Sequence, residues 1–142
     1  MNSFNPDALK LENQLCFPLY AASKEVVRKY RPYLDALDLT YTQYIAMMVL
    51  WEEKSINVKA LGARLFLDSG TLTPMLKSME AKGLITRTRS KADERVVVAT
   101  ITQKGEELKK AAKAVPLKMA GCISLNSEEA LQLYTLLYKI LE

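Results

Sequence analysis

The sequence predicts a mainly helical α+β fold in which two short helices, joined by a tight turn, precede a β-hairpin. Three observations predict it. Apolar residues recur at helical spacing over most of the chain, a polar turn separates two short helical segments, and the stretch 84–102 is rich in Thr, Val and Ile. The length of 142 residues suits one hydrophobic core. We therefore expect a single domain over residues 1–142.

The composition excludes several classes of function. Apolar residues make up 49% of the chain and charged residues 25%, as in ordinary soluble domains. There is no histidine, which excludes Ser-His-Asp and Cys-His catalysis and most zinc sites. No apolar run reaches the roughly 20 residues of a membrane-spanning helix, and the N-terminus lacks the order of a signal peptide. We therefore expect a cytoplasmic protein that is not an enzyme and has no metal, cofactor or membrane partner.

The first helix is expected from residue 8 to about residue 29, because apolar side chains recur there on one stripe. Pro18 lies inside this segment and predicts a kink. Pro32 predicts a break in the chain, followed by a short helix from Tyr33 to Leu37.

A buried core helix is expected over residues 41–53. This segment is strongly apolar, and it follows Thr40 and Gln43, which have the spacing of a capping box. A helix with so few polar positions must be covered on most sides, so we place it at the centre of the domain.

Two short helices come next. Asn57 can cap one over residues 58–66, and a polar turn at 67–70 precedes another over 71–83, which a glycine ends. Two short helices with a tight turn make a helix-turn-helix.

The hydrophobic period changes after the second short helix. Residues 84–90 and 95–102 are rich in Thr, Val and Ile, and the polar stretch 91–94 separates them, which predicts a β-hairpin. A hairpin directly after a helix-turn-helix is a wing. We therefore expect a winged helix-turn-helix over about residues 41–102.

The terminal segments are expected to form a homodimer interface. Thr102 can cap a long helix interrupted near Pro116, and Asn126 can cap a last helix. These helices and the first one carry apolar stripes that a small domain leaves uncovered. Burial in a two-fold dimer over about residues 8–38 and 103–142 is the simplest solution, and it suits the reading of two half-sites on DNA.

Basic residues are concentrated in one quarter of the chain. Segment 59–95 holds eight Lys/Arg and four Asp/Glu, a net charge of +4, whereas the remainder holds 12 of each. Such a segment is typical of a surface that faces a polyanion such as double-stranded DNA. A chance excess on a solvated face is the alternative.

The start of the second short helix and the wing supply the candidate DNA contacts. Short hydroxyl side chains at a helix N-terminus suit phosphate oxygens, and threonine methyl groups can touch thymine. Arginines in a wing suit a narrow minor groove, and Asp93 is close enough in sequence to hold Arg95 in place. Simple helix caps and a solvated hairpin are the alternatives. The candidates are Ser69, Thr71, Thr73 and Lys77 in the helix and Arg87, Arg89, Asp93 and Arg95 in the wing.

Four stretches resemble the MarR family of winged-helix regulators and, within it, the organic hydroperoxide-resistance branch. They are KLENQLCFPLYAASKEV, LDLTYTQYIAMMVLWE, LDSGTLTPMLKSMEAKGLITRTRS and DERVVVATIT, and they extend over nearly all of the chain up to about residue 105. The resemblance implies a winged-helix homodimer that represses transcription. It also implies that Asp68 and Pro74 belong to the DNA surface.

The resemblance further implies a redox chemistry. Cys16 would sense an organic hydroperoxide, with Tyr30 and Tyr41 of the partner subunit near its sulfur. The oxidised sulfur would then condense with a second thiol, for which Cys122 and a low-molecular-weight thiol are the candidates. The alternatives, from the residues alone, are that Cys16 is a core residue on an apolar stripe with no cation at helical contact spacing, and that Cys122 is a buried apolar filler.

The function that these observations favour is a repressor that releases its operator when Cys16 is oxidised. One alternative is a regulator of the same fold that a phenolic or lipophilic ligand releases from DNA. A thiol peroxidase is disfavoured, because no His, Arg or Thr lies at helical contact spacing from Cys16. An adaptor that does not bind DNA is a further alternative.

Overall fold

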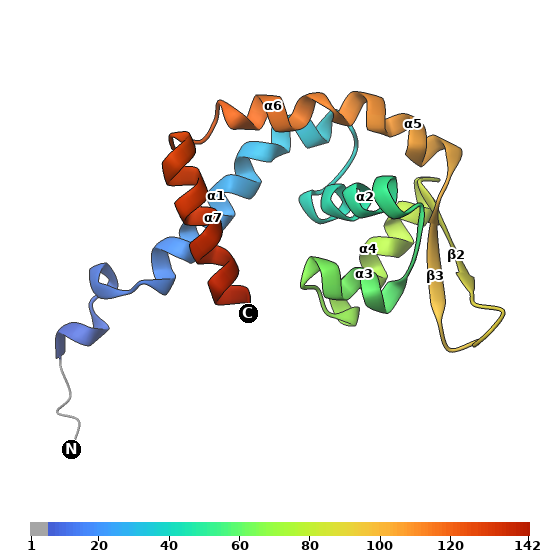
Figure 1. Cartoon of the computed structure of the whole chain (residues 1–142), viewed down its shortest axis with the longest axis horizontal. Helices are drawn as coiled ribbons and strands as arrows, with labels where there is room; N and C mark the ends of the chain where they lie inside the picture. The colour runs from blue at the N-terminus through green and yellow to red at the C-terminus, as the bar shows by residue number, and fades with distance from the viewer. Residues whose placement is uncertain (1–5) are drawn as a thin grey trace, which may run out of the picture.

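The computed structural model describes residues 6–142, so residues 1–5 of the predicted domain lie outside it. It confirms a mainly helical α+β fold with one small antiparallel sheet (Figure 1). Helices α2 to α4 and the sheet lie on one side of the molecule, α1 and α7 lie on the other, and α5 and α6 run between them (Figure 1).

In chain order the elements are two short 3-10 helices (Pro6–Leu9 and Leu11–Asn13), α1 (Cys16–Asp35), α2 (Tyr41–Glu53), β1 (Ser55–Asn57), α3 (Val58–Leu65), α4 (Ser69–Ala81), β2 (Ile85–Arg89), β3 (Val97–Ile101), α5 (Gln103–Ala112), α6 (Ala114–Ala120) and α7 (Ser127–Leu141).

Helix α2 begins at the predicted capping box. The Thr40 hydroxyl accepts a hydrogen bond from the Gln43 backbone N–H at 3.2 Å, and the Gln43 side-chain oxygen accepts one from the Thr40 N–H at 3.2 Å. These two bonds satisfy N–H groups that a helix start leaves without partners. The predicted core helix is thus confirmed, with seven of its residues buried.

Helix α4 begins at Ser69, two residues before its predicted start. The Asp68 carboxylate accepts a hydrogen bond from the Thr71 N–H at 2.8 Å, which makes Asp68 the cap. At the other end Gly83 adopts a φ of +79°, which an L side chain would resist. Asp68 and Gly83 therefore set the two ends of the second helix of the helix-turn-helix.

The predicted hairpin of β2 and β3 is confirmed, and a third strand joins it. Strand β1 pairs antiparallel with β3, so the order in the sheet is β1-β3-β2. Ile56 of β1 and Arg87 of β2 both face Ala99 of the central strand in register. A three-residue strand has too few positions to show a period of two, which explains why the sequence pattern does not reveal it.

Helix α1 runs unbroken from Cys16 to Asp35, so the predicted start at residue 8, kink at Pro18 and break at Pro32 are wrong. Pro18 lies in the first turn, where the helix needs no N–H donor. Pro32 lies in the last turn and costs one hydrogen bond. Leu34, just beyond it, is buried in the core and holds this end of the helix in place.

The C-terminal helices begin as predicted, since Thr102 caps α5 and Asn126 caps α7. The expected interruption lies at Lys113, not at Pro116. Pro116 occupies the first turn of α6, where proline is tolerated.

The buried core lies among α2, α3, α4 and the sheet and extends to α6. Trp51 on α2 donates a hydrogen bond from its indole N–H to the Gly105 carbonyl at 2.9 Å, which ties α2 to the start of α5. Among the described residues, no helix is both long and apolar enough to cross a bilayer.

Exposed apolar side chains gather on the terminal helices. Every large exposed apolar residue of the described chain, except Met48 and Phe66, lies in segments 9–27 and 117–141. Helix α7 has no buried residue at all. Uncovered apolar surface of this extent is typical of an interaction site, in agreement with the expectation of a partner along these helices.

Replacing Gly105 with alanine should destabilise the fold. A Cβ at this position would meet the Leu84 carbonyl oxygen at 2.4 Å and the Ile101 side chain at 2.7 Å. We expect the free energy of unfolding to fall by about 1–3 kcal/mol, as is usual for overpacking, in urea denaturation followed by circular dichroism. Gly121→Ala is the matched control, because its Cβ would meet only the Lys118 oxygen at 3.8 Å. Equal stability of the two variants would contradict the prediction.

Candidate nucleic-acid interface and thiol site

The outer face of α4 carries the predicted contact residues. The opposite face is buried, since Leu72, Met75, Leu76 and Met79 pack into the core. Helical periodicity therefore leaves the candidate side chains exposed. They are Ser69, Thr71, Thr73, Pro74 and Lys77. Asp68 is placed differently, because the hydrogen bond from Thr71 occupies one of its carboxylate oxygens.

The tip of the wing holds Arg95 in the way that the sequence predicts. The Asp93 carboxylate accepts hydrogen bonds from the Arg95 backbone N–H at 3.0 Å and from its side-chain Nε at 3.2 Å. The Arg95 side chain is nevertheless 92% exposed. Arg89, also exposed, donates to the Glu94 carbonyl oxygen at 2.8 Å. Both guanidinium groups are thus oriented while remaining open to an anion.

Arg87 is placed differently from the other arginines of the hairpin. Its Nη2 pairs with Glu80 Oε1 at 3.2 Å, and its backbone N–H donates to Glu80 Oε2 at 2.8 Å. Its side chain is only 23% exposed, and its buried Nε has no hydrogen-bond partner. Arg87 therefore fixes β2 to α4, and we exclude it from the exposed contact surface.

A groove of about 490 Å³ joins α3, the start of α4 and the wing. Ser69 and Arg95, which come from different elements, both line it. Lys59 lines it too, although it is not among the predicted contacts. Its position in the first turn of α3, the first helix of the helix-turn-helix, is the signal that could have identified it. The groove brings polar and cationic side chains of three elements to one surface.

Cys16 is the first residue of α1 and is exposed, with a free thiol. The sequence pattern places it inside a longer helix on an apolar stripe, and the structure corrects this position. Because Cys16 is exposed, its thiol is open both to solvent and to an oxidant.

Tyr30 and Tyr41 lie together in a cluster of three tyrosines. Their ring centroids are 5.0 Å apart, and Tyr44 lies 5.8 Å from the Tyr30 ring. Burial raises the pKa of all three hydroxyls, which makes them still harder to ionise than a free tyrosine. Tyr30 follows Cys16 by fourteen residues on the same helix, which corresponds to about 21 Å. Within one subunit, the structure does not bring the cluster to the Cys16 thiol.

Cys122 is half-buried against the opposite end of α1. Its sulfur lies 3.6 Å from the Tyr33 hydroxyl and donates to the Lys118 carbonyl oxygen at 3.3 Å. The hydrogen bond with Cys122 raises the pKa of Tyr33. Tyr33 follows Cys16 by seventeen residues along α1, or about 25 Å. The two thiols of one chain are thus held at opposite ends of a rigid helix.

Comparisons with known proteins agree with this architecture. Residues 28–112 match the model of the SarA/Rot family of transcriptional regulators. The chain is 51% identical over 136 residues to the organic hydroperoxide resistance transcriptional regulator of Bacillus subtilis, covering 96% of this chain and 92% of that protein. Two solved structures of AbfR from Staphylococcus epidermidis, each 32% identical, are also similar. Reduced AbfR bound to DNA gives a TM-score of 0.78 over 95% of this chain and 94% of AbfR, and disulfide-formed AbfR gives 0.66 over 96% of each.

The pair of Glu80 and Arg87 should make stability depend on pH. Hydrogen bonds from the Arg87 backbone and side chain hold the pKa of Glu80 below its usual 4.5. A depressed carboxyl pKa contributes stability above the usual value, and this contribution is lost as the pH falls through the lower folded-state value. We expect Glu80→Gln to lower the melting temperature at pH 7, with a difference from the wild type that shrinks as the pH is taken below 4.5. A difference that is constant from pH 7 to pH 3 would rule out the ion pair as its cause.

Proposed function

The chain belongs to the MarR/SarA family of winged-helix transcriptional regulators, and on this premise we propose that it is a redox-sensing repressor that releases operator DNA when an organic hydroperoxide oxidises Cys16. One observation carries the proposal. An exposed thiol at the start of α1 occurs in a chain that is 51% identical to a regulator of organic hydroperoxide resistance. AbfR, which shares the fold, has been solved both reduced on DNA and with a disulfide formed.

The exposed face of α4 and the tip of the wing form the proposed DNA surface. The α4 side chains and Lys59 suit base edges and phosphates in a major groove, and Arg89 and Arg95 suit the adjacent minor groove. Asp68 and Asp93 act by positioning, since each holds a hydrogen bond within its own element.

A homodimer is part of the proposal, because it covers the apolar faces of α1 and α7 and presents two copies of α4. Two recognition helices must lie about 34 Å apart to enter successive major grooves of a duplex. The spacing between subunits then decides whether the protein binds, and a chemical change at the interface can control it.

The chemistry begins with attack of the Cys16 thiolate on the terminal oxygen of a hydroperoxide. The O–O bond breaks, sulfur takes the oxygen as a sulfenic acid, and the rest of the oxidant leaves as an alcohol. A second thiol then displaces water from the sulfenic acid and forms a disulfide. The hydroxyls of Tyr30 and Tyr41 of the partner subunit are the proposed donors to the thiolate, since a tyrosine hydroxyl is protonated at neutral pH.

The second thiol cannot be Cys122 of the same subunit while α1 stays intact. A disulfide requires Cα atoms within about 7 Å, whereas Cys122 packs on Tyr33, about 25 Å along α1 from Cys16. Two candidates follow, namely Cys122 of the partner subunit and a low-molecular-weight thiol. Either product would alter the packing of α1, and the former would join the two subunits covalently.

Replacing Cys16 with serine should separate DNA binding from the response to oxidant. We expect Cys16→Ser to bind operator duplex like the wild type and to remain bound after one equivalent of cumene hydroperoxide, measured by fluorescence anisotropy. The operator is a duplex selected by the wild-type protein from a random-sequence pool. Normal release of the serine variant would show that Cys16 is not the sensor, and release by a phenolic compound without oxidation would favour a ligand-gated regulator instead.

Cys122→Ser serves as the matched control in the same experiment. Mass spectrometry with and without added thiol then identifies the product. A covalent dimer that Cys122→Ser abolishes indicates an intersubunit disulfide, whereas an adduct on Cys16 in both proteins indicates a small thiol.

Arg95→Ala should weaken DNA binding and reduce its dependence on salt. The side chain is exposed and oriented by Asp93, so its loss removes one cationic contact per subunit. We expect affinity to fall by about 1–3 kcal/mol and the slope of log K against log salt to fall by about 1 per subunit. Lys110→Ala, on the exposed surface of α5, controls for the loss of charge. An unchanged salt slope in Arg95→Ala would exclude the wing tip from the contact.

A further inference from the structure

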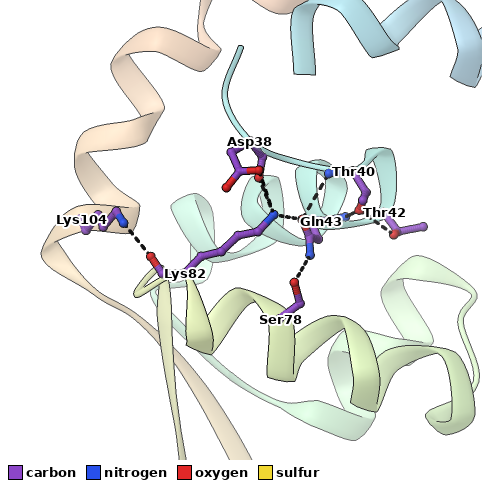
Figure 2. A network of polar contacts seen from close by, with 7 residues as sticks. All are labelled: Asp38, Thr40, Thr42, Gln43, Ser78, Lys82 and Lys104. Atoms are coloured by element: carbon purple, nitrogen blue, oxygen red, sulfur yellow. Dashed lines mark hydrogen bonds and ion pairs between the residues drawn. The ribbon is translucent and has the colours of Figure 1, made fainter. Parts of the chain in front are cut away.

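A buried amide lies between the start of α2 and the recognition helix α4. Gln43 is only 4% exposed, and it is the one polar residue buried among those described. Its amide NH₂ donates to the Ser78 hydroxyl of α4 at 3.1 Å. Its carbonyl oxygen accepts from the Thr40 N–H at 3.2 Å and from the Lys82 ammonium at 3.0 Å. Figure 2 shows these bonds converging on one side chain.

Lys82 connects the amide to the segment that follows α1. Its ammonium donates to the backbone carbonyl of Asp38 and also lies 3.6 Å from the Asp38 carboxylate. Asp38 adopts a left-handed φ of 54° in the connection between α1 and α2. The Lys82 side chain is only 25% exposed, although it carries a charge. Two acceptor atoms of Asp38 and one of Gln43 therefore hold the ammonium of Lys82.

Lys82 also connects α4 to α5. Its backbone carbonyl, at the C-terminal cap of α4, accepts a hydrogen bond from the Lys104 ammonium at 2.7 Å. Lys104 lies in the first turn of α5. The C-terminal end of α4 is thus bound to the α1–α2 connection and α2 through the Lys82 ammonium and to α5 through the Lys82 backbone carbonyl, as Figure 2 shows.

These contacts join the helices that carry the proposed dimer interface to the helix that carries the proposed DNA contacts. We propose that Lys82 is a positioning residue, which fixes α4 relative to α1 and α5 through its contacts with Asp38, Gln43 and Lys104. In this way it couples the state of the terminal helices to the binding of DNA. The coupling rests on the proposed function, whereas the positioning of α4 does not. Lys82 itself need not touch DNA.

The geometry explains why a lysine is needed here. An apolar side chain of the same length, such as methionine, would remove the donor that the Asp38 carbonyl and the Gln43 oxygen share. Gln43 would keep its bonds to Thr40 and Ser78, whereas the bond that ties the α1–α2 connection to α4 would be lost. Helix α4 would then keep its own cap and core contacts but lose its fixed position relative to α1.

Lys82→Met tests the proposal on the full-length dimer. The readout is the ratio of affinities for the selected operator and for a scrambled duplex, both measured with reduced protein. A merely stabilising residue would leave this ratio unchanged, while a positioning residue would not. We expect the ratio to fall about 3- to 20-fold, with Lys82→Arg restoring most of it because a guanidinium keeps donors for Asp38 and Gln43. Lys110→Met is the control for loss of one positive charge.

The oxidant supplies a second readout. We expect the change in operator affinity on treatment with cumene hydroperoxide to be several-fold smaller in Lys82→Met than in the wild type, at an equal rate of Cys16 oxidation. If the wild type does not respond to oxidant, the proposed redox function fails, and the operator ratio of the reduced protein still decides on the role of Lys82.

Lys104→Met provides a second test in case Lys82→Met does not fold. Lys104 is exposed, and among the described residues its side chain bonds to the Lys82 carbonyl alone. Its replacement should therefore leave the melting temperature unchanged while lowering the operator ratio to a smaller extent. Wild-type ratios in a folded, dimeric Lys82→Met overturn the proposal. If that variant does not fold, a wild-type ratio in Lys104→Met overturns it.

Discussion

A buried amide must have its hydrogen bonds made within the protein, and in this chain that requirement falls on Gln43. Its side chain caps α2, accepts from Lys82 and donates to Ser78. Because water cannot replace these partners at low cost, α2 and α4 are held in one relative position. The outer face of α4 is exposed, and the orientation of that face depends on the buried bonds behind it.

The parts of the fold that depend on neighbours in sequence are predictable. The capping box at Thr40, the caps at Asn57 and Asn126 and the hairpin all follow from residues a few positions apart. The errors lie where distant packing decides. Helix α1 continues through Pro32 because Leu34 is buried against the core, and β1 exists because β3 offers it an edge. Neither contact can be recognised from the residues nearby in the sequence.

The same distinction applies to the candidate site, where features set by nearby residues are predictable and features set by distant contacts are not. Exposure of the α4 residues follows from the helical period, and the contact between Asp93 and Arg95 follows from their spacing. Sequence could not show that Arg87 faces Glu80, because seven residues and a turn separate them. It also could not show that Cys16 begins a helix and does not lie inside one. That position depends on where the chain leaves its 3-10 segments, and a regular apolar stripe conceals the change.

On the proposed function, the charge of the loop at the end of the hairpin affects how the protein searches DNA. Lys91, Asp93, Glu94 and Arg95 together carry no net charge. A neutral tip gains little from the counterions that any stretch of duplex releases, so it does not prolong residence on random sequence. On the proposed function, the tip adds to the lifetime of the complex where a narrow minor groove receives Arg95 in the orientation that Asp93 gives it. The charge of Asp93 offsets the general attraction of Arg95 for phosphates, which shortens each stop on random sequence.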